Sequence, residues 1–403
     1  MPRIVTLTTL TALLLATLAP AAPSSELRSA AAATLLAQTN SVALVSSTQP
    51  AGTLDESLQH EVSAAIDRGL DWLAANQKPD GSWSNPDFPA LSALALWSFS
   101  RAEHPRKAAV EDAALRYILS CVHSNGAIYR DVPDRKGGGL VNYNTAICMT
   151  ALHATGRPDL RRIVQQARTF VAGSQYLGDD EYRGGFGYDA DTKRAYTDLL
   201  NTYYSAQAMR MTADAEETRP AGEPRADINW NETVSYMGKM QNPESTGPDN
   251  AGGFFYNPSD PKAGTVTNAD GVVVFRSYGS ITYAGVLALV FADVSREDLR
   301  VRSALKWAER HWTLEENPGM GQDGRYFFYH VLARALAATG HDTVSQTDGT
   351  QLNWRTALAR KILELQRIDP ATGAGFWIND TGRYWESDPV LTTAYSLLAL
   401  EAL

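Results

Sequence analysis

The chain has 403 residues, of which 44% are hydrophobic and 20% are charged, and its formal net charge is −9. This is ordinary globular composition, with enough length for a large core. The sequence has no block of Lys and Arg that would form a basic stripe along a phosphate backbone, so we expect no nucleic-acid partner.

The N-terminus has the pattern of an export signal. Arg3 precedes an apolar run from Ile4 to Leu18, which is short for a membrane span, and small residues follow at 19–22. We predict a signal peptide over 1–22 and an exported, periplasmic or secreted protein with no stable membrane span after cleavage. An uncleaved anchor is the alternative. Residues 23–57, rich in Ala, Ser and Thr, are predicted to be a flexible leader.

Six units follow from about residue 58, each with a helix, a Gly-containing loop and a second, more apolar helix. The first helices are expected to end near Gln77, His123, Gln175, Gln241, Trp312 and Gln366. The second helices are expected at 89–102, 142–155, 198–211, 278–291, 326–338 and 389–402. This pattern predicts an all-α fold, an α/α toroid that is a double ring of six helical hairpins over 58–403. An open solenoid is the alternative.

Two registers recur among these units. In the first helices an aromatic residue stands five positions before a Gln, as in Trp72 and Gln77. In four of the second helices the pattern is Thr-x5-Ala-(Leu/Met), with Pro89 and Tyr329 at the Thr position of the first and fifth units. A Thr near a helix start can cap the helix. The apolar second helices are expected to form the inner ring.

The segment from Arg68 to Trp83, Arg-Gly-x2-Trp-Leu-x3-Gln-x3-Gly-x-Trp, resembles the QW repeat of squalene cyclases. The region 58–403 as a whole resembles the prenyltransferase and squalene oxidase repeat superfamily. The resemblance implies a toroid in which the Gln caps the outer helix and ties neighbouring hairpins together. That role is structural, so the motif specifies a fold rather than a chemistry.

The catalytic motifs of that superfamily are missing at the matching positions. Class II cyclases place Asp-x-Asp-Asp before the inner-helix Thr, and the middle Asp protonates the substrate. Here the run from Asp198 to Asn201 keeps the first Asp and has Leu200 at the donor position. The Asp-x-Cys zinc motif of the protein prenyltransferases is absent, because Leu119 and Ala146 stand two positions before Cys121 and Cys148, where the motif has Asp. We therefore predict no metal site and no cofactor.

Several residues remain as candidates for a site. Asp198, Asp189, Asp191 and His330 are the candidate catalytic groups, although Asp198 also suits a helix N-cap and His330 a packing role. The candidate ligand-binding residues at the ends of the second helices are Tyr143, Asn144, Asn201, Tyr204, Tyr278, Tyr329 and Trp385. Loops 186–197 and 256–277, and the segment from Tyr384 to Asp388, are expected near the mouth of a central funnel.

These observations leave three functional hypotheses. The first is an exported repeat protein without cyclase or transferase chemistry, whose funnel binds an apolar, isoprenoid or glycan ligand or a protein partner. The second is a squalene or terpene cyclase-like enzyme with a non-standard acid. The third is a toroid polysaccharide lyase or hydrolase, which would need converging carboxylates. Cys121 and Cys148 are either a disulfide or two buried thiols.

Overall fold

The computed structural model of the protein describes residues 53–132, 139–189, 196–346 and 348–403. The predicted signal peptide and most of the predicted leader lie outside this part of the chain. The first helices of the six units are α2 (Glu56–Ala75), α4 (Lys107–Leu119), α6 (Arg161–Gly173), α8 (Trp230–Lys239), α10 (Leu299–Arg310) and α12 (Trp354–Glu364). The second helices are α3 (Pro89–Arg101), α5 (Val141–Ala154), α7 (Leu199–Met211), α9 (Gly279–Phe291), α11 (Arg325–Ala338) and α13 (Pro389–Leu400).

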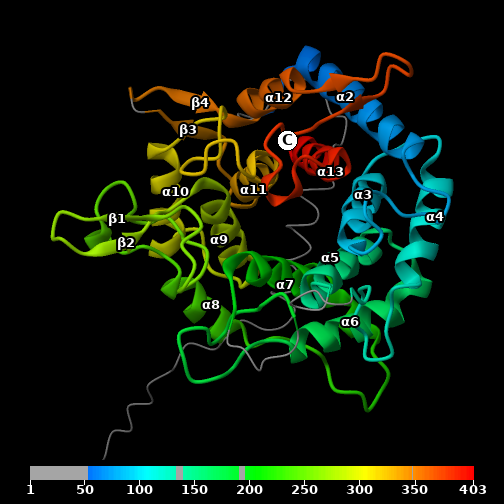
Figure 1. Cartoon of the computed structure of the whole chain (residues 1–403), viewed down its shortest axis with the longest axis horizontal. Helices are drawn as coiled ribbons and strands as arrows, with labels where there is room; N and C mark the ends of the chain where they lie inside the picture. The colour runs from blue at the N-terminus through cyan, green and yellow to red at the C-terminus, as the bar shows by residue number, and fades with distance from the viewer. Residues whose placement is uncertain (1–52, 133–138, 190–195, 347) are drawn as a thin grey trace, which may run out of the picture.

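The second helices form a closed inner ring. Each of them contacts the next in chain order, and α13 contacts α3 (Figure 1). The first helices lie outside this ring, and α12 contacts α2. Burial follows this arrangement, since every residue of α9 except Val290 is buried, whereas α10 buries one face around Trp307. A helix that is apolar all round needs neighbours on all sides, which is what the inner ring supplies.

The described chain is mostly helical, as predicted, and its few strands are only two or three residues long. Three short antiparallel hairpins join the helices: β1 (Thr265–Thr267) with β2 (Val273–Phe275), β3 (Thr343–Ser345) with β4 (Gln351–Asn353), and β5 (Arg367–Ile368) with β6 (Gly375–Phe376). Short 3-10 turns lie at η1 (Pro158–Leu160), η2 (Ala213–Thr218), η3 (Glu244–Thr246) and η4 (Arg383–Trp385). The leader was also predicted two residues too long, because Asp55 caps α2 and the helix begins at Glu56.

Where a glutamine follows the first helix, as in the first, third, fourth and sixth units, it connects two units. α2 ends at Ala75, close to the predicted end near Gln77, and Gln77 itself lies just after the helix. Its Nε2 donates to the carbonyl oxygens of Gly81 at 3.1 Å and Val110 at 3.0 Å. Val110 belongs to α4, so one amide holds its own loop against the next outer helix. Gln366 closes the circle, with Nε2 donating to the Ala65 carbonyl of α2 at 2.9 Å.

In the first four units, a loop glycine lets the hairpin approach the next outer helix closely. Gly184 has φ +95°, and a Cβ added there would lie 2.0 Å from the carbonyl oxygen of Glu232 on α8. Gly81 and Gly252 repeat this arrangement against α4 and α10. Only glycine combines a left-handed backbone with no Cβ at so short a distance. The six-unit ring therefore depends on these positions for its spacing.

The repeated threonine of the inner helices does not act as the cap we expected. Thr202 Oγ1 accepts the backbone N–H of Phe186 at 3.1 Å, so it anchors the Gly/aromatic loop onto the inner helix. In the first unit this role belongs to Ser92, whose Oγ accepts the N–H of Trp83 at 2.9 Å. The assignment of Pro89 to the Thr position was therefore wrong. Ala95 and Leu96 follow Pro89 at the spacing of the pattern, but Ser92, three residues later, makes the equivalent contact.

Two further features bear on the sequence predictions. Cys121 and Cys148 are both buried and free, so the structure contains no disulfide between them. Within the described ranges, no helix combines the length and apolar character needed to cross a membrane.

We predict that Gly184→Ala strongly destabilises the protein, because the new methyl group would collide with the α8 backbone in addition to straining a left-handed residue. The expected loss is about 3 kcal/mol or more of unfolding free energy in urea denaturation. Gly222→Ala is the matched control, because Gly222 has φ +91° but open space around it. That variant should lose only about 1–2 kcal/mol. Equal losses in the two variants would contradict a packing role for Gly184.

Candidate functional site

The main cavity of the described structure lies at the N-terminal ends of the inner helices and has a volume of about 560 Å³. Every inner helix, or the residue just before it, contributes to the wall. Examples are Leu91, Tyr143, Leu200, Ile281, Phe327 and Tyr395, one for each of the six units. Aromatic and aliphatic side chains therefore surround a central space, and the positive ends of the inner-helix dipoles point toward it.

Two long loops complete the wall, as their length suggested. Tyr188 and Tyr196 come from loop 186–197, and Tyr256 and Lys262 come from loop 256–277. The Lys262 ammonium group lies 4.8 Å from the centre of the Tyr256 ring and pairs with Asp260 at 2.6 Å. The one lysine of the wall is thus already neutralised by a neighbouring carboxylate.

The segment before α13 brings an aromatic pair and strained backbone to the cavity. Tyr384 and Trp385 both have left-handed backbones, with φ of 59° and 66°. The Trp385 ring packs edge-on against Phe88, with centroids 4.9 Å apart. Left-handed conformations in non-glycine residues cost of order 1–3 kcal/mol each and cluster at functional sites. Here they turn the chain so that Trp385 and Glu386 both line the cavity.

Glu386 is the only carboxylate that lines this cavity among the described residues, and it is 1% exposed. Its Oε1 accepts the backbone N–H of Phe327 at 2.8 Å, and its Oε2 accepts the side-chain amide of Asn379 at 2.7 Å. α11 has Gly324 as N-cap and no side-chain cap of its own, so Glu386 caps it from a distance in sequence. Burial raises the pKa of Glu386 to about 7, although these hydrogen bonds lower it.

Three tyrosine hydroxyls meet beside the cavity. The hydroxyl oxygens of Tyr204 and Tyr395 are 3.2 Å apart, and Tyr143 packs edge-on against Tyr204 with ring centroids 5.2 Å apart. They come from α7, α13 and α5, so side chains distant in sequence meet in one cluster. Burial raises the pKa of Tyr143 to about 12 and keeps the hydroxyls protonated.

Leu200 and Asp198 lie in different environments, and the sequence did not predict this difference. Leu200, which the sequence resemblance matched to the cyclase acid, lines the cavity as an apolar wall residue. Asp198 is fully buried at the N-cap of α7, where its Oδ1 accepts the Asn201 N–H at 2.8 Å and its Oδ2 accepts the Asn201 amide at 2.7 Å. Burial raises its pKa to about 6. The expected N-cap role is confirmed, and Asp198 is not among the residues that line the cavity.

The other predicted residues fall into two groups. Tyr143, Tyr278 and Trp385 line the cavity. Asn144, Asn201, Tyr204, Tyr329 and His330 are buried behind its wall. For example, Asn144 Oδ1 accepts the Ala90 N–H at 2.9 Å, and the Tyr329 hydroxyl donates to the Leu314 carbonyl.

His330 lies between Trp97 and Tyr395, with the Tyr395 ring stacked at 5.3 Å. Neither ring nitrogen has a hydrogen-bond partner among the described residues, and burial lowers its pKa well below the ordinary value. It is therefore a neutral packing residue at physiological pH. Asp189 is half-buried and outside the cavity wall, and Asp191 lies outside the described residues.

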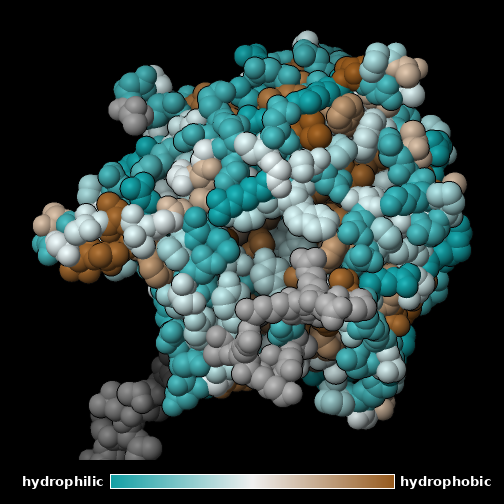
Figure 2. Space-filling model, viewed as in Figure 1, coloured by the Kyte–Doolittle hydropathy of each residue, from teal (hydrophilic) through white to brown (hydrophobic). Residues whose placement is uncertain are grey.

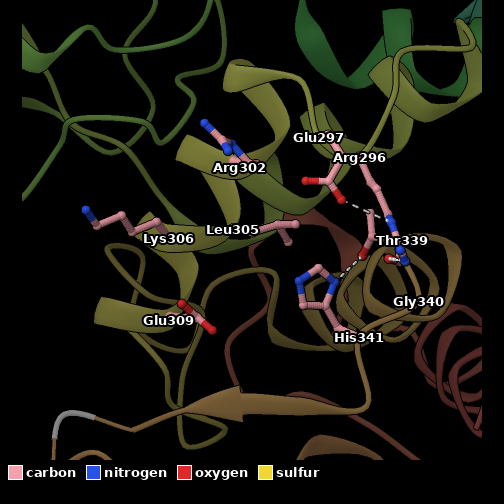
Figure 3. Close-up of a pocket in the computed structure, with 9 residues that line it drawn as sticks. All are labelled: Arg296, Glu297, Arg302, Leu305, Lys306, Glu309, Thr339, Gly340 and His341. Atoms are coloured by element: carbon pink, nitrogen blue, oxygen red, sulfur yellow. Dashed lines mark hydrogen bonds and ion pairs between the residues drawn. The ribbon is translucent and has the colours of Figure 1, made fainter.

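A second cleft, of about 440 Å³, lies between α10 and the C-terminal end of α11 (Figure 3). Its wall is polar, with Arg302 and Lys306 on α10 and His341 bonded through Nδ1 to Thr339 Oγ1 at 2.9 Å. The described chain offers no group of His, Cys, Asp and Glu suited to a metal ion. On the surface, Figure 2 shows an apolar patch at the β1–β2 hairpin, where Val272 and Val273 are 55% and 64% exposed.

Sequence reasoning missed several wall residues, among them Glu386, Phe327, Tyr256 and Lys262. Glu386 was recognised only as part of a segment near the mouth. Its role depends on hydrogen bonds to Asn379 and to the start of α11. The contact with α11 joins residues 59 positions apart, and a local sequence pattern cannot predict it.

The comparisons with known proteins identify the fold class but no family. No family model matches the sequence, and no curated protein matches it. Solved structures that share the fold include a type II terpene cyclase from Scytonema in complex with geranylgeranyl dihydroxybenzoate, at 13% identity, TM-score 0.52, covering 86% of this chain and 98% of that one. A D-mannose isomerase has 12% identity and TM-score 0.54, with 88% and 99% covered. An α-1,6-mannanase from Salegentibacter has 11% identity and TM-score 0.51, with 85% and 98% covered. The protein is therefore a helical toroid of the kind used by these enzymes.

We predict that Asp198 makes the protein less stable as pH rises. Its folded-state pKa of about 6 lies above the ordinary 3.8, so its favourable contribution is complete below about pH 4 and is lost through pH 6. Asp198→Asn removes this titration, and Asn201 Oδ1, which has no partner in the described structure, can accept the new amide after a flip. Between pH 4.5 and 7.5 the wild type should lose about 2 kcal/mol more unfolding free energy than the variant. If the unfolding free energies of the wild type and the variant, measured by urea denaturation, change with pH in the same way, Asp198 is not desolvated.

Proposed function

We propose that this chain is an exported toroid that binds an apolar ligand of isoprenoid type in its funnel cavity. The observation that carries the proposal is the wall: aromatic rings and aliphatic side chains from all six units enclose about 560 Å³. Each CH₂ group that a ligand buries there contributes about 0.8 kcal/mol, so a branched hydrocarbon chain binds without a charged anchor. The single lysine of the wall is paired with Asp260 and offers no free charge.

The same fold supports both isoprenoid and sugar chemistry in other proteins, so the fold does not choose between them. The Scytonema cyclase is recorded with geranylgeranyl dihydroxybenzoate as substrate, whereas a mannose isomerase and a mannanase are equally similar in fold. The composition of this wall favours the isoprenoid. Sugar cleavage by the usual route needs two carboxyl groups across the bond, and Glu386 is the single carboxylate lining the cavity within the described ranges.

An acid-catalysed reaction on the bound ligand is a second candidate function. It is favoured by the buried carboxyl of Glu386, whose pKa of about 7 leaves much of it protonated at neutral pH. Asp198 has a pKa of about 6, but it lies behind the wall and is therefore less accessible to a bound ligand than Glu386. Recovery of squalene and farnesol unchanged after prolonged incubation with the purified protein would contradict this second function and leave the first intact.

We predict that Leu200→Trp weakens binding of farnesol at least tenfold, because the larger side chain fills the cavity where Leu200 lines it. Isothermal titration calorimetry measures the affinity without interference from the added indole. Leu177→Trp is the control, because Leu177 is 47% exposed and lies outside the cavity wall. Unchanged affinity in Leu200→Trp, or no farnesol binding by the wild type, would count against the funnel as the binding site.

A further inference from the structure

The hydrogen bonds of Glu386 limit where an acid proton on this residue can point. A carboxyl group has about four lone-pair positions, and a protonated one uses one of them for its O–H. The groups that contact Glu386 are all donors: the N–H groups of Phe327 and Tyr326 on α11, and the side-chain amide of Asn379. Three donors and one proton fill the four positions. The O–H of the neutral acid therefore finds no acceptor in this set.

The cavity is the remaining direction for that proton, because Glu386 lines it while being 1% exposed. A buried O–H without an acceptor is unfavourable, and an acceptor on a ligand would relieve that cost. Two other polar groups of the wall, Asn317 and Lys262, are already paired. Asn317 donates its amide to Ser280 Oγ and to the Asp323 carbonyl, each at 3.0 Å, and Lys262 pairs with Asp260.

We infer that the cavity selects an apolar molecule carrying one oxygen acceptor, such as an isoprenoid ketone, and that the Glu386 carboxylic acid donates the hydrogen bond that holds this oxygen. The inference rests on the proposed binding function and adds the chemical class of the ligand. The inner-helix N-termini around the cavity also favour an electron-rich oxygen over a hydrocarbon at this end of the ring.

This arrangement makes ligand binding sensitive to pH near neutrality. The charged and titratable groups that face Glu386 are Arg325, Tyr326 and Tyr329 on α11, and Tyr395 on α13. Burial raises the pKa of each of these tyrosines, so they stay protonated between pH 6 and 8.5. The wall hydroxyls of Tyr278 and Tyr384 can also donate to a ligand, but burial raises the pKa of both, so they give no pH dependence in this range.

The test compares farnesylacetone, an isoprenoid ketone, with the isoprenoid hydrocarbon farnesene, using calorimetric titration of the full chain at pH 6.0 and 8.5. We expect the ketone to bind more tightly than farnesene at pH 6.0 and to lose up to about 30-fold in affinity at pH 8.5, as the acid with a pKa of about 7 ionises. The affinity for farnesene should fall clearly less between pH 6.0 and pH 8.5. Glu386→Gln keeps an N–H donor without titrating, so its ketone affinity should be independent of pH.

Asp198→Asn is the control for a second buried acid close to the cavity, and the ketone should keep its pH dependence in that variant. If Glu386→Gln does not fold, the comparison of ketone and hydrocarbon binding to the wild type still tests the inference. Equal affinity for ketone and hydrocarbon at pH 6.0, or the same pH dependence for both, would overturn the inference while leaving the binding function standing. Failure of both ligands to bind at either pH would overturn the binding function and the inference together.

Discussion

In the first four units, the close approach of a loop glycine to the next outer helix is the contact on which the rest of the structure depends. At Gly184 the backbone adopts φ +95° directly against the Glu232 carbonyl, and the nearby Gln175 amide bonds to Gly184 and to Asn229 at the start of α8. The equivalent contacts at Gly81 and Gly252 space the units in the same way. A side chain at any of these points would push one hairpin away from its neighbour, and a closed ring cannot absorb such a displacement locally.

This spacing also determines where the cavity forms. The inner helices run in the same direction, so their N-terminal ends, and the loops that precede them, meet on one side of the ring. The Ser92, Thr202 and Thr393 hydroxyls hold those loops down by accepting their backbone N–H groups. Leu200, two residues after the Asp198 cap of α7, then faces the cavity with an apolar side chain.

The sequence predicted the repeating parts of this structure well and the non-repeating parts poorly. Periodicity located the inner helices to within two residues, since α9 runs from Gly279 to Phe291 against an expected 278–291. It could not show that Glu386 caps α11, because that contact joins segments whose distance in sequence carries no pattern. Polarity at helix ends pointed to Asn144 and Asn201, but both amides serve the backbone or a buried cap, whereas the cavity wall consists largely of tyrosine and leucine.

The central claim is that the toroid holds its ligand in the funnel between the inner-helix N-termini. A crystal structure of the full chain grown with farnesol tests it most directly. We predict continuous ligand density bounded by Leu200, Tyr278 and Trp385. Ligand density only in the polar cleft beside α10, or a funnel occupied by the protein's own side chains, would contradict the account.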